Sequence, residues 1–241
     1  MPRNTFRLGG TFAALALCLA IPAGTQETGG DLGRLTALEA ELARLEHELT
    51  LLEDSKAIKR LQRAYGYYVD QKRADQIQAL FADDATVELG GLGVFVGKDR
   101  IGEFYRWIMG GDLEEGELYS HMILQGVVNV APDGATGKGR WRALIMLGEH
   151  GESATWGEGP YENEYVKEDG VWKFSKVHWY QTVAAPYDPG WHQAQIPLAG
   201  PSDEFPPDRP PTEIYESYPG AYLPIYHYDN PVSGRPAGGT P

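Results

Sequence analysis

The sequence has few of the residues on which several common classes of protein depend. Its 241 residues contain a single cysteine, which excludes an internal disulfide framework and any zinc or iron–sulfur site built from several cysteines. Basic residues are outnumbered, with 21 Lys and Arg against 34 Asp and Glu, for a net charge of −13. Because an acidic surface repels the phosphates of DNA and RNA, nucleic acid is not an expected partner.

Motifs of several catalytic chemistries are also missing. There is no Gly-x-Ser-x-Gly elbow, no phosphate-binding loop and no dinucleotide fingerprint. His-x-x-x-His and His-Glu-x-x-His are absent as well, so a helical metal-binding pair is unsupported. Chemistry must therefore come from residues that only the fold brings together.

The first 24 residues have the order of a secretory signal. Arg3 and Arg7 precede an apolar run over residues 8 to 21, and small residues follow at 22 to 25. The run is short for a membrane span, which needs about 20 apolar residues. We predict cleavage near residue 24, export to a bacterial periplasm and no stable membrane insertion afterwards; an uncleaved anchor is the alternative. Cleavage would remove Cys18, so thiol catalysis is not expected.

A leucine repeat follows over residues 31–53. Its spacing of threes and fours places one stripe along a helix, made by Leu32, Leu35, Leu38, Leu42, Leu45, Leu49 and Leu52. Glutamates take the neighbouring e and g heptad positions, so a parallel pair of two copies would place acid beside acid. The stripe predicts an oligomer contact of another geometry or packing against the protein's own domain. An amphipathic helix without a partner is the alternative.

Residues 54–185 predict a globular domain that begins with helices. One helix is expected to start at Asp54 or Ser55, a short one covers 75–81, and Asp83-Asp84 predict a turn. Two short strands flank Gly90-Gly91, and a helix covers 99–109. Four strands then cover 121–130, 136–147, 155–167 and 171–184. This order predicts an α+β fold in which one curved antiparallel sheet wraps around helices and leaves a mostly apolar pocket.

Alternation along the strands indicates which side chains face this pocket. Every second residue of a strand faces the same side, which groups His121 with Asn129, and Tyr161 with Asn163. We predict that Asp70, near a helix end, hydrogen-bonds the His121 imidazole and raises its basicity. A capping role for Asp70 and a core role for His121 are the structural alternatives. The predicted substrate-binding residues are Tyr65, Tyr68, Tyr105, Arg106, Asn129, Tyr161 and His178, with a surface ion pair as the alternative for Arg106.

Short segments in a specific order resemble the SnoaL-like branch of the nuclear transport factor 2-like superfamily. They lie between residues 54 and 185 and include Tyr68-Val69-Asp70, Leu80-Phe81-Ala82-Asp83-Asp84, Ser120-His121, Tyr161-Glu162-Asn163 and Asp169-Gly170-Val171-Trp172. The resemblance implies a cone-shaped barrel, trimeric or dimeric, that transfers protons without a metal or organic cofactor. In hexachlorocyclohexane dehydrochlorinase and scytalone dehydratase, which the core resembles, an Asp assists a catalytic His. In the first of these the pair falls on Asp70 and His121.

The last 56 residues, 186–241, have a different composition from the rest. They hold 13 of the 17 prolines and six tyrosines. Proline opposes helices and central strands, and tails that stay disordered are normally poor in aromatics. We predict an extended arm, packed over its own barrel or a neighbour's, whose aromatics narrow the pocket mouth; a disordered tail is the alternative.

Together these features predict an exported, cofactor-independent lyase that acts on a small hydrophobic or aromatic compound. His121 would remove a proton, Asp70 would orient the imidazole, and water or a small fragment such as formaldehyde would leave. A homo-oligomer is expected, a trimer in preference to a dimer. An isomerase or cyclase of the same fold, or a non-catalytic periplasmic binding module, are the alternatives.

Overall fold

The structure of the protein is a computed structural model that describes residues 28–237. The predicted signal segment over 1–24 and the last four residues of the arm lie outside these residues. The chain divides into two compact units, residues 1–45 and 46–241. In the described part of the first unit the chain is helical throughout. None of the helices within residues 28–237 is both long enough and apolar enough to cross a membrane.

The leucine repeat and the first helix of the domain belong to one continuous helix, α1 (Thr28–Asp70). The predicted helix start at Asp54 or Ser55 is therefore wrong. Asp54 is buried, and its Oδ1 accepts hydrogen bonds from the indole N–H of Trp172 at 2.8 Å and from the Lys167 ammonium at 2.7 Å. Its carboxylate thus ties the helix to the sheet and does not cap a helix end.

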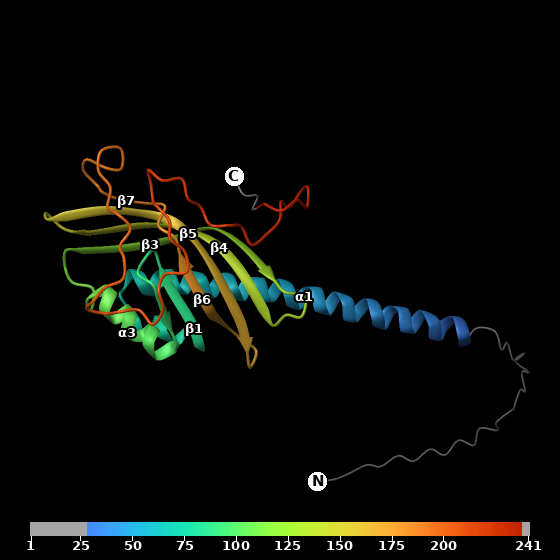
Figure 1. The fold of residues 1–241 in the computed structure, drawn as a ribbon. Helices are drawn as coiled ribbons and strands as arrows, with labels where there is room; N and C mark the ends of the chain where they lie inside the picture. Colours follow the sequence, from blue (N-terminus) through green and yellow to red (C-terminus); the bar gives the residue numbers. More distant parts are fainter. Residues whose placement is uncertain (1–27, 238–241) are drawn as a thin grey trace, which may run out of the picture. The chain divides into compact units, whose positions relative to one another are not determined.

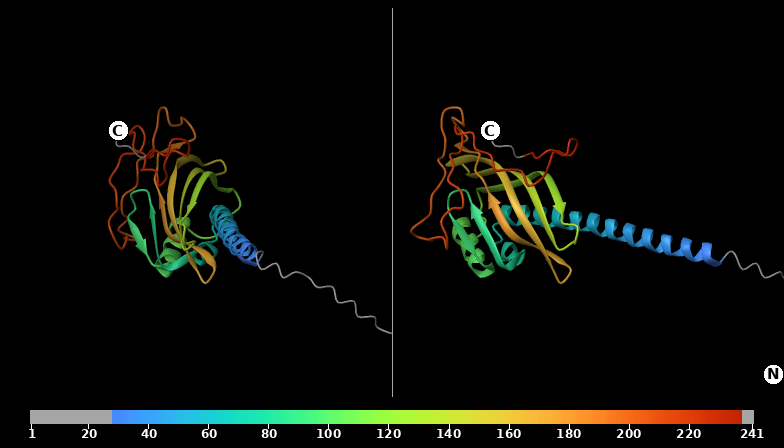
Figure 2. Two further views of the ribbon diagram at one scale, coloured as in Figure 1. Left: turned by 90° about the vertical axis from the view of Figure 1, so that its right-hand side faces the viewer. Right: turned by 45° about the vertical axis from the view of Figure 1, so that its right-hand side comes forward.

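Seven strands form one curved sheet (Figures 1 and 2). They are β1 (Phe81–Leu89), β2 (Val94–Val96), β3 (Glu117–Val130), β4 (Thr136–Glu149), β5 (Ser153–Glu168), β6 (Val171–Trp179) and β7 (Val183–Pro186). The order is β2-β1-β6-β5-β4-β3, and β7 pairs with β5. The predicted α+β architecture with a long antiparallel meander is confirmed. One pair, β1 with β6, is parallel, and Asp83 and Asp84 lie within β1 and not in the predicted turn.

The concave face of the sheet holds the core. Strands β3 to β6 curve around the C-terminal half of α1, with α2 (Ala74–Ala79) and α3 (Lys98–Met109) beside them (Figure 1). Helix α3 buries one face because its apolar residues recur at helical spacing. The largest fully buried apolar side chains come from the three helices and four strands: Ile58, Tyr65, Ile77, Phe81, Phe95, Ile101, Phe104, Tyr105, Tyr161, Tyr165 and Phe174.

Two β-bulges reverse the direction in which the side chains of their strands point. On β3, Leu124 pairs with Arg142 but Val127 pairs with Arg140, so β3 has one residue more than β4 there. On β6, Phe174 pairs with Tyr165 and Lys176 with Glu164, which makes Ser175 the extra residue. Because side chains alternate with a period of two, one extra residue moves every later side chain to the other face.

The C-terminal arm, residues 187–237, packs over the barrel of its own chain. Arg209 of the arm and Val94 of β2 exchange backbone hydrogen bonds. The centre of the Phe205 ring lies 3.9 Å from the guanidinium carbon of Arg100. Further along, Thr212 donates hydrogen bonds from its backbone N–H and its hydroxyl to the buried carboxylate of Glu88. Of the two predicted locations of the arm, the structure shows the one on its own barrel.

Candidate functional site

A cavity of about 340 Å³ lies between the concave face of the sheet, the helices and the arm. Its volume is at the lower end of the roughly 300–1,000 Å³ of small-molecule sites, so it fits a compact ligand. No Asp, Glu, Lys or Arg of the described chain lines it. Its polar side chains are one imidazole, four phenols, one hydroxyl, one amide and two indoles, from His121, Tyr65, Tyr105, Tyr119, Tyr161, Thr155, Gln181, Trp156 and Trp179.

His121 is the basic group of this cavity. It lies on β3 before the bulge, is 8% exposed, and its Nε2 is 2.8 Å from the Tyr161 hydroxyl. Removal of the imidazole from water lowers its pKa from 6.5 to about 4, because burial disfavours the charged form. At neutral pH the ring is therefore uncharged and has a nitrogen that can accept a proton.

A chain of buried tyrosine hydroxyls leads away from this imidazole. Tyr161 contacts the Tyr65 hydroxyl at 3.3 Å, and Tyr65 contacts the Tyr105 hydroxyl at 2.9 Å. The three rings come from β5, α1 and α3, so no short segment of sequence contains the chain. Burial raises the pKa of all three phenols, which keeps them protonated and able to donate hydrogen bonds. The same effect raises the pKa of Tyr119, which also lines the cavity, to about 12.

Asp70 contacts His121 in another way than the sequence predicts. Its Oδ1 accepts a hydrogen bond from the backbone N–H of His121 at 2.5 Å, and the imidazole is bound by Tyr161. The predicted carboxylate–imidazole bond is thus replaced by a carboxylate–backbone bond. Asp70 is the last residue of α1, where its short side chain meets the edge of β3. Partial burial raises the pKa of this carboxyl group, and the hydrogen bond from His121 opposes that rise.

Some of the other predicted residues line the cavity and the rest lie outside it. Tyr65, Tyr105 and Tyr161 line the cavity, as described above. Tyr68 packs against the hydrophobic core but does not line the cavity. Arg106 is exposed and pairs with Asp75 at 2.8 Å, so its alternative, a surface ion pair, describes it and its placement in the pocket is wrong.

Asn129 and His178 lie on the outer face of the sheet, so their predicted places in the pocket are wrong. The two errors have one cause. Each follows a bulge, which turns it away from the concave face. The Asn129 amide oxygen is 3.1 Å from Nε2 of His227 in the arm. The His178 ring stacks on Tyr180 with 3.9 Å between centroids and lies 3.6 Å from the Glu88 carboxylate.

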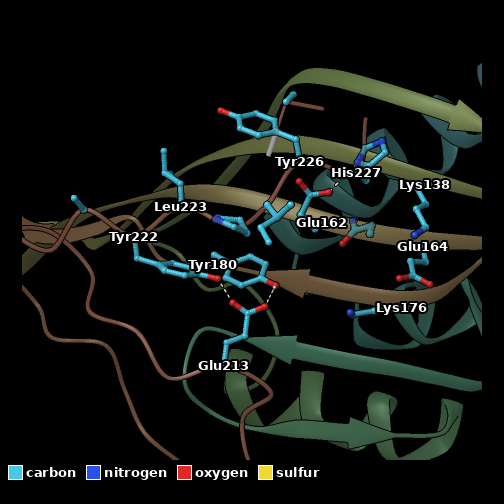
Figure 3. Close-up of a pocket in the computed structure, with 15 residues that line it drawn as sticks. Lys138, Glu162, Glu164, Lys176, Tyr180, Glu213, Tyr222, Leu223, Tyr226 and His227 are labelled. Carbon is cyan, nitrogen blue, oxygen red and sulfur yellow. Dashed lines mark hydrogen bonds and ion pairs between the residues drawn. The ribbon is translucent and has the colours of Figure 1, made fainter. Parts of the chain in front are cut away.

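Beneath the arm, this outer face forms a second and larger cleft of about 850 Å³ (Figure 3). Its floor carries Lys138, Glu164 and Lys176 from three adjacent strands, and Tyr180 and Tyr222 both donate to the Glu213 carboxylate on its arm side. The cleft has charged groups of both signs, and its one imidazole, that of His227, is paired with the Glu162 carboxylate at 2.9 Å. We therefore assign the candidate site to the smaller inner cavity.

Several lining residues were not predicted. Tyr119 is two residues before His121 on β3, so the same alternation could have placed it on the inner face. Ile196 and Leu198 of the arm close one side of the cavity next to the β1–β2 hairpin. No pattern in the sequence indicates their position, because the arm has neither helical nor strand periodicity. The arm segment at the cavity is thus aliphatic, and the aromatics that the sequence predicts at the pocket mouth do not line it.

Comparison with known proteins gives a family match and several similar folds. The family model described as SnoaL-like domain matches residues 50–178. A candidate scytalone dehydratase from Novosphingobium aromaticivorans DSM 12444 is 22% identical over 64% of this chain and 96% of its own, with a TM-score of 0.52. A type 2 hexachlorocyclohexane dehydrochlorinase, LinA, is 22% identical over 58% of this chain and 92% of its own, with a TM-score of 0.51.

The type 3 enzyme of that name, from Novosphingobium barchaimii LL02, is 21% identical over 58% and 93% of the two chains, with a TM-score of 0.50. At these identities the three structures show a shared fold. No protein of curated function matches the sequence.

Proposed function

The chain belongs to the SnoaL-like domain family, as its sequence predicts, and from this premise we propose that it is a cofactor-independent lyase for a small, uncharged hydrophobic compound. The observation that carries the proposal is the inner cavity, where an uncharged imidazole and a chain of protonated phenols are enclosed without a charged side chain. Such a site can move a proton but offers no counter-ion for a charged substrate. Aromatic walls from Trp156 and Trp179 favour a substrate with an aromatic ring.

In the proposed reaction, His121 accepts a proton from a carbon atom of the substrate. The electrons of the broken C–H bond form a double bond to the neighbouring carbon. A hydroxyl on that carbon takes a proton from a cavity tyrosine and leaves as water. The imidazolium then returns its proton to the tyrosine through the Tyr161 hydroxyl, so the protein is restored. If His121 instead takes the proton of a hydroxymethyl O–H, the C–C bond to that group breaks and formaldehyde leaves. The carbon left behind keeps the electrons of that bond and takes a proton from the cavity tyrosine, so the product is lighter by formaldehyde.

Product analysis tests this proposal. Purified protein would be incubated with a panel of aromatic diols, hydroxyketones and phenolic dimers, and the products followed by mass spectrometry. We expect a product lighter than its substrate by water or formaldehyde. A product of unchanged mass would show an isomerase or cyclase instead, and binding without conversion across the panel would contradict catalysis.

The pH dependence of the reaction follows from the lowered pKa of His121. Below a pH of about 4 the ring is protonated and cannot accept a proton, so kcat/KM should fall about tenfold per pH unit there. Above it the neutral ring persists, and the rate should stay level through pH 7. A pH–rate profile of the best substrate, with circular dichroism at each pH to confirm folding, measures this. A fall in kcat/KM that begins near pH 6.5 would contradict the lowered pKa of His121.

Asp70 is proposed as a positioning residue, and two substitutions distinguish this role from a carboxylate–imidazole dyad. Asp70→Asn keeps an oxygen that can accept the His121 backbone N–H, so it should retain activity within about threefold. Asp70→Ala loses the bond and should lower kcat by about tenfold or more, since hydrogen bonds to charged groups contribute about 1.5–3 kcal/mol. Neither substitution should shift the pH below which kcat/KM falls. Equal and severe losses in both variants would instead support the dyad.

Two further parts of the proposal rest on the sequence. The order of residues 1–24 supports export to a periplasm with loss of the signal, and the family resemblance supports a homo-oligomer, a trimer before a dimer. N-terminal sequencing of protein recovered from the periplasm tests the first. Sedimentation equilibrium of the purified protein tests the second.

A further inference from the structure

The leucine stripe of α1 faces away from the core in the part of the helix that packs on the sheet. Leu49 and Ile58 are nine residues apart, which is two and a half turns at 3.6 residues per turn, so they point in opposite directions. Leu52 and Leu61 have the same separation. Ile58 is fully buried and Leu61 packs against the core, whereas Leu49 and Leu52 are 56% and 61% exposed. A helix that buries one face in the domain therefore presents its leucines on the other.

This exposure continues along the whole repeat. All seven leucines of the stripe are between 48% and 66% exposed. They cover a length of about 30 Å at 1.5 Å per residue. Single exposed leucines are ordinary, but a contiguous apolar face of this length marks an interaction surface. We call the seven leucines the leucine face.

One border of the leucine face carries unbalanced negative charge. With leucines at a and d, Glu39, Glu46 and Glu53 occupy the e positions. Among the described residues none of these three takes part in an ion pair within 4.0 Å. On the other border, by contrast, Glu41 is held by Arg44 at 2.7 Å. The acidic e row thus offers three carboxylates to a partner.

These charges decide which kind of helix can cover the leucine face. A second copy in parallel would place Glu46 and Glu53 beside the glutamates at positions 41 and 48 of the first, and an antiparallel copy would place e rows together. Like charges at such positions are destabilising. We propose that the leucine face binds a helix of another protein, with leucines at the same heptad spacing and Lys or Arg beside them. This inference does not depend on the proposed function.

Designed peptides test the proposal with the purified protein. One labelled peptide of three heptads would carry leucine at a and d and lysine at e and g, and a matched peptide would carry glutamate at e and g. Fluorescence anisotropy should show the lysine peptide binding at least about tenfold tighter, because its lysines attract the three glutamates whereas the glutamates of the matched peptide repel them. Binding should weaken at high salt. The Glu39→Lys, Glu46→Lys, Glu53→Lys variant should prefer the glutamate peptide.

A pair of matched variants separates this binding from general attraction to an acidic protein. Leu42→Asp with Leu49→Asp should abolish binding of the lysine peptide. Ala40→Asp with His47→Asp, at exposed positions on another side of the helix, should leave it unchanged. Equal binding by both variants, equal affinity for both peptides or no binding of either would overturn the proposal. A native oligomer that dissociates in the leucine variant would overturn it in favour of a second copy.

Discussion

Replacing His121 with alanine is expected to lower kcat by about 10²- to 10⁴-fold, the range that a positioned acid or base contributes. Within the inner cavity, His121 is the one side chain of the described chain that can accept a proton at neutral pH. The tyrosines around it are held protonated by burial, and Gln181 is not basic. Removal of the imidazole therefore leaves a cavity that still holds the substrate but lacks a base.

Substrate binding and a second histidine provide the controls for this loss. His121→Ala should bind a substrate within about tenfold of the parent, because apolar walls form most of the cavity. His150 is exposed in the turn between β4 and β5, so His150→Ala should keep full activity. Steady-state kinetics with both variants on the substrate found in the panel measure the difference. Full activity in His121→Ala would show that the base lies elsewhere.

Replacing Gly159 with alanine is expected to destabilise the fold by about 3 kcal/mol or more, at or above the usual cost of overpacking. A Cβ atom at Gly159 would lie 1.8 Å from the carbonyl oxygen of Tyr180 and 2.9 Å from the backbone nitrogen of Thr182. The obstacle is backbone and not a flexible side chain. Tyr180 and Thr182 also donate backbone hydrogen bonds to the carbonyl groups of Pro160 and Glu158, so this segment is held along the edge of β5 and has no room to move away.

Chemical denaturation with urea measures this effect, and another glycine provides the control. Nothing lies within 4 Å of the position that a Cβ would take at Gly200, so Gly200→Ala should change the free energy of unfolding by less than about 0.5 kcal/mol. Because Trp179 and Gln181 of this segment line the cavity, Gly159→Ala should also impair substrate binding. An unfolding midpoint equal to that of the parent would contradict the close approach of the two backbones.

The misplaced site residues show where reasoning from sequence reaches its limit. Alternation places His121 and Tyr161 correctly on the concave face, because no bulge interrupts the pattern before them. It fails for Asn129 and His178, each of which follows one extra residue. The first bulge has a local signal, since Gly126 interrupts the strand and a Cβ there would lie 2.1 Å from the Trp141 ring. The second, at Ser175, has none.

The sequence by itself determines the order of helices and strands, the leucine stripe, the family and the inner-face positions of His121 and Tyr161. These follow from helical and strand periodicity and from short motifs, which are local properties of the chain. Only the tertiary structure decides that Asp70 binds the backbone of His121, that three tyrosines from separate elements form one chain, and that the arm closes the cavity. Those contacts join residues far apart in the sequence, so they exist only once the sheet has curved and its bulges have fixed which face each side chain takes.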